Sequence, residues 1–242
     1  MKGLITDEFL TVEAKFVNAV RARNLLHVII ASNETWTIPA DCDVRRFSVL
    51  RFGEEHKDDH KYFRAMWEQL HDGGFEALLH HLLYEVDLDG FNPRKHLDTK
   101  ELIDQKQLSL TGIEAIFFEC LVRGTLPARE LNGDGSVNLR GQDLIDWARE
   151  KRLRGSEYVS TVHVGYLFKG NPKWQREGLG FEKHNPQSVL GRVNVWKIPP
   201  LKEAREHWDK YRFKVDWDAK NSAGSLWGLE KLAAWKDGDS DA

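Results

Sequence analysis

Cysteine is scarce in this chain of 242 residues: Cys42 and Cys120 are its only two, and they do not form a C-x-x-C pair. This excludes a disulfide framework and a zinc site built on paired cysteines, and it favours a reducing compartment. Long apolar runs are also missing, since no segment approaches the roughly 20 apolar residues of a membrane-spanning helix. Without a recognisable secretory leader, we expect a soluble protein of the cytoplasm, with no membrane partner.

A large excess of charge of one sign is missing as well, because the formal net charge is only −3. This average hides two opposite segments. Residues 53–139 carry 17 acidic and nine basic side chains, a net charge of −8, whereas residues 140–215 carry nine acidic and 16 basic ones, a net charge of +7. Such an asymmetry indicates a module that faces nucleic acid, although a solvated basic face would have the same composition.

The beginning of the chain holds its most ordered pattern. Two alternating stretches, Thr11–Lys15 and Val17–Arg23, predict a β-hairpin whose turn falls near Lys15. The apolar run Leu25–Ala31 predicts a buried strand, and Phe47–Phe52 predicts a second one. Polar residues follow the first strand directly, at a position where α/β proteins bind ligands. The pattern therefore predicts part of a strand-based core with a functional edge.

Five short motifs stand in a fixed order in this region. They are Leu4-Ile5-Thr6, Lys15, Ala31-Ser32-Asn33, Ile38-Pro39-Ala40 and Arg45-Arg46-Phe47. Their order resembles that of superfamily 3 helicases, above all the primase-helicases of phages, prophages and plasmids. The resemblance is detailed over residues 2–52 and looser to about residue 210. It implies the ATPase core of a DNA replication helicase.

The resemblance implies roles for four of these residues. Lys15 would lie at the hairpin tip and contact DNA in the pore of a hexameric ring, and Asn33 would sense the γ-phosphate of ATP. An arginine finger would follow, because a guanidinium stays charged and stabilises the transferring phosphate. Strand alternation sends Arg45 and Arg46 to opposite faces, so only one of them can reach the site. The family's spacing favours Arg45.

The phosphate-binding motifs of such an enzyme do not occur in this sequence. There is no G-x-x-x-x-G-K-[ST] loop, and no apolar strand ending in paired acids for Mg²⁺ precedes the hairpin. The resemblance therefore implies the carboxyl-terminal portion of a helicase of the bacterial host cytoplasm, starting after the Walker B motif. ATP and Mg²⁺ are expected in the complete enzyme, and neither is expected to bind this chain tightly. Its partners would be DNA, an upstream ATPase or primase portion, and further copies in a ring.

Helical periodicity replaces the strand pattern between residues 56 and 130. Apolar residues recur there at three- and four-residue spacings, Gly73-Gly74 interrupts the pattern, and Gly124 ends it. These helices are expected to form a linker or collar. The pair His80-His81 lacks the spacing and the cysteine partners of a metal site, so no metal ligand is predicted.

The positive segment predicts a winged helix, a variant of the helix-turn-helix whose second helix enters a DNA groove. Leu139–Arg154 predicts the first helix, Glu157–Phe168 the second with Ser156 as its N-cap, and Gly191–Ile198 a strand. This order also resembles the carboxyl-terminal winged helix of phage primase-helicases. A winged helix used only for packing or protein contact is the alternative. The candidate DNA contacts are Arg149, Lys151, Arg152 and Lys169.

The expected fold is mixed α/β and has four parts. They are a carboxyl-terminal remnant of an AAA+-like P-loop helicase core (1–55), a helical linker (56–130), a winged-helix DNA-binding domain (138–213) and a tail (214–242). Two functions remain open. The chain is either the carboxyl-terminal part of an ATP-dependent replication helicase, with Asn33, Arg45 and Arg46 as catalytic candidates, or a stand-alone, non-catalytic DNA-binding or assembly module.

Overall fold

The structure is a computed structural model with a mixed α/β fold. It describes residues 5, 7–13, 15, 18–40, 47–92, 99–171, 176–184, 187–188, 191–192, 195–220, 224–233 and 235. The chain divides into two compact units. The first comprises Met1–Ala31 and Arg45–Leu102, and the second comprises Ser32–Val44 and Ile103–Ala242.

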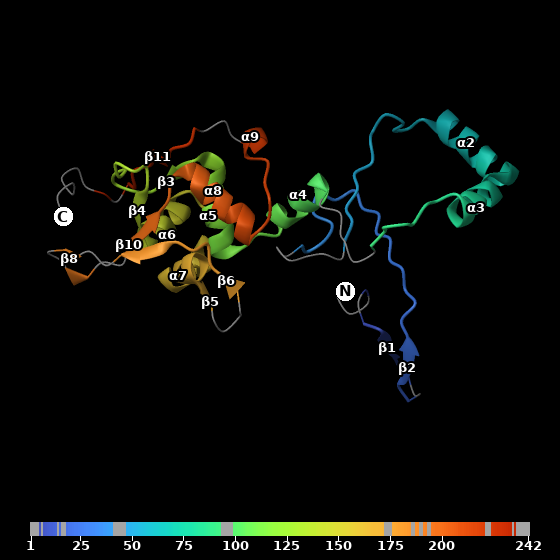
Figure 1. Ribbon diagram of the computed structural model, residues 1–242, viewed down its shortest axis with the longest axis horizontal. Coiled ribbons are helices and arrows are strands. Elements are labelled where there is room, and N and C mark those ends of the chain that lie inside the picture. Colours follow the sequence, from blue (N-terminus) through green and yellow to red (C-terminus); the bar gives the residue numbers. More distant parts are fainter. Residues whose placement is uncertain are drawn as a thin grey trace. The chain divides into compact units, whose positions relative to one another are not determined.

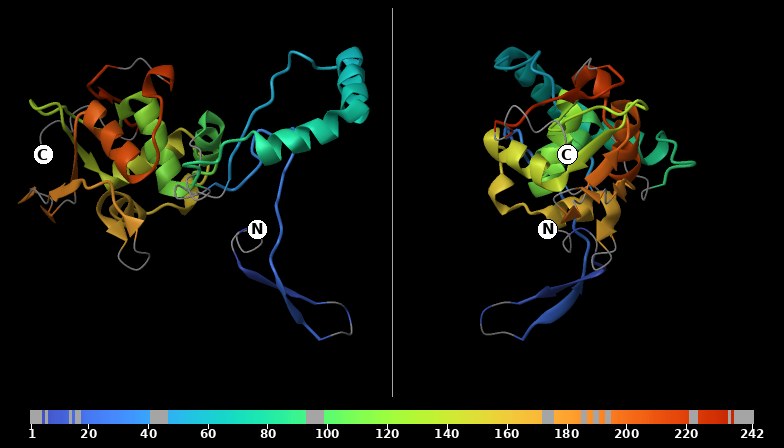
Figure 2. Two further views of the ribbon diagram at one scale, coloured as in Figure 1. Left: turned by 45° about the vertical axis from the view of Figure 1, so that its right-hand side comes forward. Right: turned by 90° about the vertical axis from the view of Figure 1, so that its left-hand side faces the viewer.

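The first unit contains the predicted β-hairpin. β1 (Phe9–Val12) pairs antiparallel with β2 (Val20–Arg23), and Lys15 lies in the turn that joins them. The guanidinium of Arg21 lies over the ring of Phe9 on the opposite strand, 4.2 Å from its centroid, in a cation–π contact. The two strands form one twisted ribbon in Figure 2. The predicted hairpin and its turn at Lys15 are confirmed, but β1 lies earlier than the predicted Thr11–Lys15 and β2 begins three residues after the predicted Val17.

The two apolar segments expected as core strands are not strands. Residues 24–31 and 47–53 form neither helix nor strand, and Leu25, Ile29 and Phe52 are 75%, 96% and 88% exposed. An apolar strand is stable when neighbouring strands pair with its backbone and other layers cover its faces, and the described residues provide neither. The prediction of core strands is wrong for this structure, because apolar composition does not specify what covers a segment.

Two helices follow in the first unit, as their periodicity predicts. α2 (His60–Gln69) begins after Asp59, whose carboxylate accepts a hydrogen bond of 2.9 Å from the backbone N–H of the third helical residue. A kinked turn, η1 (Leu70–Gly74), separates it from α3 (Phe75–Tyr84). Gly73 has a φ of 84° in this turn, a conformation that glycine adopts at no steric cost. α2 and α3 contain no buried residue.

The helices of the second unit enclose one apolar core. They are α4 (Lys100–Leu108), whose first residues belong to the first unit, α5 (Gly112–Arg123), α6 (Gly141–Glu150), the short η2 (Ser156–Tyr158), α7 (Thr161–Lys169), α8 (Leu201–Tyr211) and α9 (Trp217–Lys220). Figure 1 shows α8 lying against α5. Phe117, Trp147, Phe168 and Trp208 are fully buried between these helices and the sheet.

A three-stranded antiparallel sheet runs in the order β4-β10-β7. The strands are β4 (Val137–Arg140), β7 (Glu182–His184) and β10 (Val195–Ile198). Trp196 of the central strand is opposite Leu139 on one side and Lys183 on the other. Three short ladders accompany it: β3 (Thr125–Leu126) with β11 (Gly228–Leu229), β5 (Gly170–Asn171) with β6 (Arg176–Glu177), and β8 (Gln187–Ser188) with β9 (Gly191–Arg192).

The second unit includes more of the chain than the expected winged-helix range. α5, which was expected in the helical linker, contributes Ile116 and Phe117 to the same core as α6, α7 and α8. The expected tail also belongs to this core. β11 pairs in parallel with β3, and the buried Trp227 donates a hydrogen bond from Nε1 to the Pro199 carbonyl at 2.7 Å. Part of the expected tail (214–242) is therefore docked on the second unit through Trp227.

Candidate nucleic-acid interface

One side of α7 is anchored in the core. Val164, Leu167 and Phe168 are buried, and the Phe168 ring lies 5.4 Å from the ring of Trp196 on β10 and 5.1 Å from that of Phe117 on α5. Edge-to-face aromatic contacts of this kind hold ring positions closely. The helix therefore presents its opposite side in one orientation.

The first turn of α7 is fixed by a capping box. Ser160 is the N-cap, and its backbone N–H donates to Nδ1 of His163 at 3.1 Å. The side chains of these two residues also meet, with Oγ and Nδ1 3.1 Å apart. The expected N-cap, Ser156, belongs to η2 instead. The prediction of Ser156 is wrong because both serines carry the N-cap signature, which does not distinguish them. The buried Val159, 6% exposed, lies between η2 and the N-cap of α7.

The outward side of α7 carries a small set of exposed side chains. Val162 is 56% exposed and Tyr166 is 40% exposed, and Thr161 and Lys169 are exposed as well. Gly165 lies between them, is half-buried and has no side chain to project from this side of the helix. Residues four and seven positions apart share one face of a helix, so Val162, Tyr166 and Lys169 form a continuous row.

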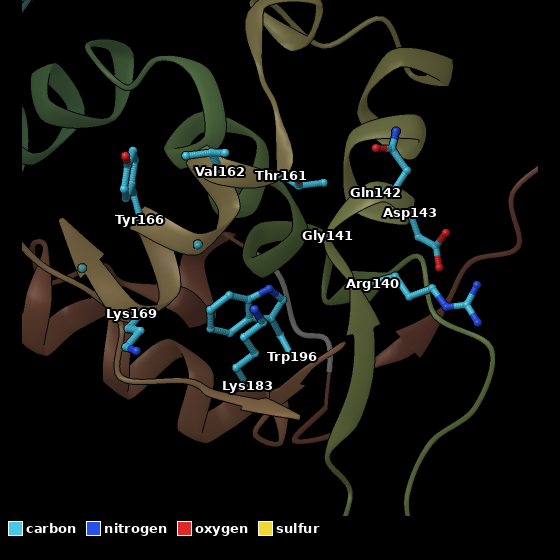
Figure 3. A pocket seen from close by; sticks show the side chains of 12 residues that line it. Arg140, Gly141, Gln142, Asp143, Thr161, Val162, Tyr166, Lys169, Lys183 and Trp196 are labelled. Atoms are coloured by element: carbon cyan, nitrogen blue, oxygen red, sulfur yellow. The ribbon is translucent and has the colours of Figure 1, made fainter. Parts of the chain in front are cut away.

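A concave pocket of about 770 Å³ opens beside this row (Figure 3). Its lining comes from the end of β4 and the start of α6, from the outward side of α7 and the residue after it, and from β7 and β10. The lining residues are Arg140, Gly141, Gln142, Asp143, Thr161, Val162, Gly165, Tyr166, Lys169, Gly170, Lys183 and Trp196. Segments that are distant in sequence thus build one site.

The pocket carries more positive than negative charge. Arg140, Lys169 and Lys183 line it, and Asp143 is the single carboxylate among the lining residues. Burial raises the pKa of the Asp143 carboxyl above its ordinary value, although the guanidinium groups of Arg140 and Arg129 oppose this shift. The first residues of α6 line the pocket, so the positive end of the dipole of this helix lies beside it. The arrangement favours an anionic ligand.

The cations predicted from the sequence are not brought together. Lys169 lines the pocket, but Arg149, Lys151 and Arg152 lie at the carboxyl-terminal end of α6, whereas the pocket contains the other end. The ammonium group of Lys151 forms an ion pair with Glu230. Arg149 Nη1 lies 3.6 Å from Asp146 Oδ1. The run of basic residues was the most visible signal in the sequence. Two of its side chains, those of Arg149 and Lys151, form ion pairs within the protein.

Sequence analysis missed Arg140 and Lys183 as well as the apolar members of the site. Arg140 is the last residue of a four-residue strand, and Lys183 lies in a strand of three residues. Strands this short are not separable from loops by alternation. The isolated position of Arg140 directly before a helix start was the one available signal, because an N-terminal helix end attracts anions.

The residues expected to act on ATP are not assembled in a described site. Asn33 is exposed in a segment that packs on α4, where Gln105 donates to the Thr35 carbonyl at 2.7 Å and accepts from the Thr37 N–H at 2.8 Å. Lys15 is exposed in the hairpin turn of the other unit. Arg45 and Arg46 lie outside the described residues.

Three further observations concern cofactors, membranes and relatives. Among the residues that the structure describes, no group of three or more His, Cys, Asp or Glu side chains could hold a metal ion. No helix in the described part of the chain combines the length and the apolar character needed to span a bilayer. No family model, no curated protein and no solved structure matches this chain.

Proposed function

We propose that residues 112–213 form a winged helix that binds duplex DNA, with α7 as its recognition helix. The observation that carries this proposal is the sheet order β4-β10-β7 combined with the chain order α5, β4, α6, α7, β7, β10. A winged helix combines three helices with a three-stranded antiparallel sheet in this connectivity, and the link between its last two strands is the wing. The short β8–β9 ladder occupies that link.

The concave face supports the same function through its shape and charge. The major groove of B-DNA is about 12 Å wide and admits an α-helix, and the exposed row of α7 is the part that would enter it. Arg140 and Lys169 line opposite sides of the pocket (Figure 3), so that they can contact phosphates at two separate points of the backbone. Such contacts supply affinity and register without reading sequence.

Fluorescence-anisotropy titrations of the full chain with duplex DNA at several salt concentrations test this proposal. Replacing Arg140, Lys169 and Lys183 together by Gln is expected to weaken binding to all sequences alike. The slope of log affinity against log salt should fall by about 0.9 for each phosphate that the variant no longer neutralises. The matched control replaces Arg149, Lys151 and Arg152 by Gln, which removes the same charge from the other end of α6. Equal effects of both replacements, or no binding at low salt, would contradict the proposal.

The β1–β2 hairpin with Lys15 in its turn favours a second, compatible role, that of the carboxyl-terminal portion of a superfamily 3 replication helicase. In that role Lys15 meets DNA in the ring, Asn33 assists the γ-phosphate and Arg45 is the arginine finger. In rings assembled with subunits that carry the P-loop, Arg45→Ala is expected to lower ATP turnover about 10³-fold or more, and Arg46→Ala is its control. Unchanged turnover in Arg45→Ala would leave the stand-alone, non-catalytic DNA-binding module.

A further inference from the structure

We infer that α7 selects thymine-containing duplex by contacting the C5-methyl groups of thymine in the major groove. This inference rests on the proposed function, and it concerns how the same site discriminates between sequences. The inference depends on two observations. One is the set of side chains that the outward side of α7 presents to base edges, and the other is the set of polar side chains that already form hydrogen bonds within the protein.

The amide and imidazole groups nearest to the pocket are already held by the protein. Gln142 donates from Nε2 to Oδ1 of Asp146 one turn further along α6, at 2.8 Å. Nδ1 of His163 accepts the N–H of Ser160 in the capping box at 3.1 Å. Recognition of adenine by Gln or Asn requires the side-chain amide to donate one hydrogen bond and accept another. The amide of Gln142 instead donates to Asp146 on its own helix. Readout of adenine by a bidentate amide is therefore poorly supplied at this site.

The pocket-lining residues at the start of α7 include one fully apolar side chain, that of Val162. Recognition helices contact base edges with their amino-terminal residues, and in α7 these are Thr161 and Val162, followed one turn later by Gly165 and Tyr166. Val162 is 56% exposed, although it is fully apolar. The thymine methyl is the apolar group that the major groove presents, and side-chain methyl groups are its usual partners.

The cations of the site lie where they position the helix and do not read bases. Lys169 is the last residue of α7, Lys183 belongs to β7, and Arg140 precedes α6. Contacts from such places go to phosphates, which are identical in every sequence. Charge complementarity thus favours a nucleic-acid duplex at this face, and Val162 in the first turn of α7 supplies its preference.

The decisive comparison uses two duplexes of equal length and alternating sequence, one with A·T pairs and one with A·U pairs. They carry the same phosphates and differ in the methyl groups. The full chain is expected to bind the thymine duplex more tightly, by about fourfold for each methyl group covered. Equal affinity for the two duplexes would overturn this inference while the proposed function stands. Binding to neither duplex at low salt would overturn the proposed function itself.

Two variants assign the preference to α7. Val162→Ser should lower the thymine-to-uracil affinity ratio by about fourfold, because it removes the methyl groups that contact the thymine methyl. The control is Leu226→Ser, which truncates another exposed apolar side chain, 53% exposed and outside the pocket lining, and should keep the wild-type ratio. Circular dichroism of both variants checks that the helices are retained. A full ratio in Val162→Ser would overturn the assignment to this face.

Discussion

Arg212, at the end of α8, and Glu114, in the first turn of α5, form a buried ion pair. Nε of Arg212 lies 2.7 Å from Oε1 of Glu114, and the two side chains are 3% and 17% exposed. Arg212 also donates from Nη1 to the Glu177 carbonyl at 3.1 Å. Nη2 of Arg176 lies 3.1 Å from the carboxylate of Glu114. One glutamate thus connects the first helix of the proposed winged helix with the last helix and with β6.

Removing this pair should destabilise the second unit strongly. We expect Arg212→Met to lower the free energy of unfolding by about 3–5 kcal/mol, because it removes the main partner of a largely buried carboxylate. The control is Arg123→Met, since Arg123 pairs with Glu119 at 2.7 Å but is 46% exposed. That exposed pair should contribute less than about 1 kcal/mol. Urea denaturation measures the effect of both substitutions, and equal values would contradict the buried role of Arg212.

Asp143 should make stability depend on pH. Burial raises the pKa of its carboxyl in the folded state, so the folded protein disfavours the ionised form. The stability that this group contributes is present below its unfolded pKa and is lost as the pH rises through the folded pKa. Asp143→Asn is therefore expected to be more stable than the wild type at neutral pH, and the difference should vanish at acidic pH. Denaturation midpoints across that range provide the measurement, and a pH-independent difference would argue against the titration.

The docked tail should contribute to the stability of the second unit. Trp227 is 4% exposed and donates to the Pro199 carbonyl at 2.7 Å. Trp227→Ala is expected to cost about 3–5 kcal/mol, the usual loss for a buried aromatic residue. Trp67→Ala, at a position that is 60% exposed, should cost far less. If both variants unfold at the same urea concentration, the tail does not belong to the core.

Gly178 packs closely against the end of α7. A Cβ on Gly178 would overlap the backbone N of Gly170 and lie 2.6 Å from the Phe168 carbonyl oxygen, whereas a Cβ on Gly133 would meet no atom within 4 Å. Gly178→Ala should therefore displace backbone next to Lys169, with a loss of stability of about 1–3 kcal/mol and weaker DNA binding. Gly133→Ala serves as the control. Thermal unfolding and anisotropy check the pair, and unaltered behaviour of Gly178→Ala would refute the close packing.

Signals contained within one or two turns were predictable from the sequence. The apolar spacing located α2, α3, α5 and α6, and Gly124, with a φ of 66°, ends α5 as predicted. Alternation located the β1–β2 hairpin. The same reasoning gave the wrong N-cap for α7, because Ser156 and Ser160 carry equal local signals. It also predicted core strands at residues 25–31 and 47–52. An apolar run indicates a tendency to be buried, but it does not indicate which other segment covers it.

The sequence by itself determined α5, α6 and the positive charge of residues 140–215, since propensity and charge belong to the residues themselves. The tertiary structure alone decided which charges share a site. Arg140 and Lys183 line the same pocket as Lys169 of α7. The sheet order β4-β10-β7 is the reason, because it places the end of β4 and the strand β7 beside that helix. The denser basic run at the end of α6 stays outside that pocket, since a helix of ten residues places its two ends about 15 Å apart.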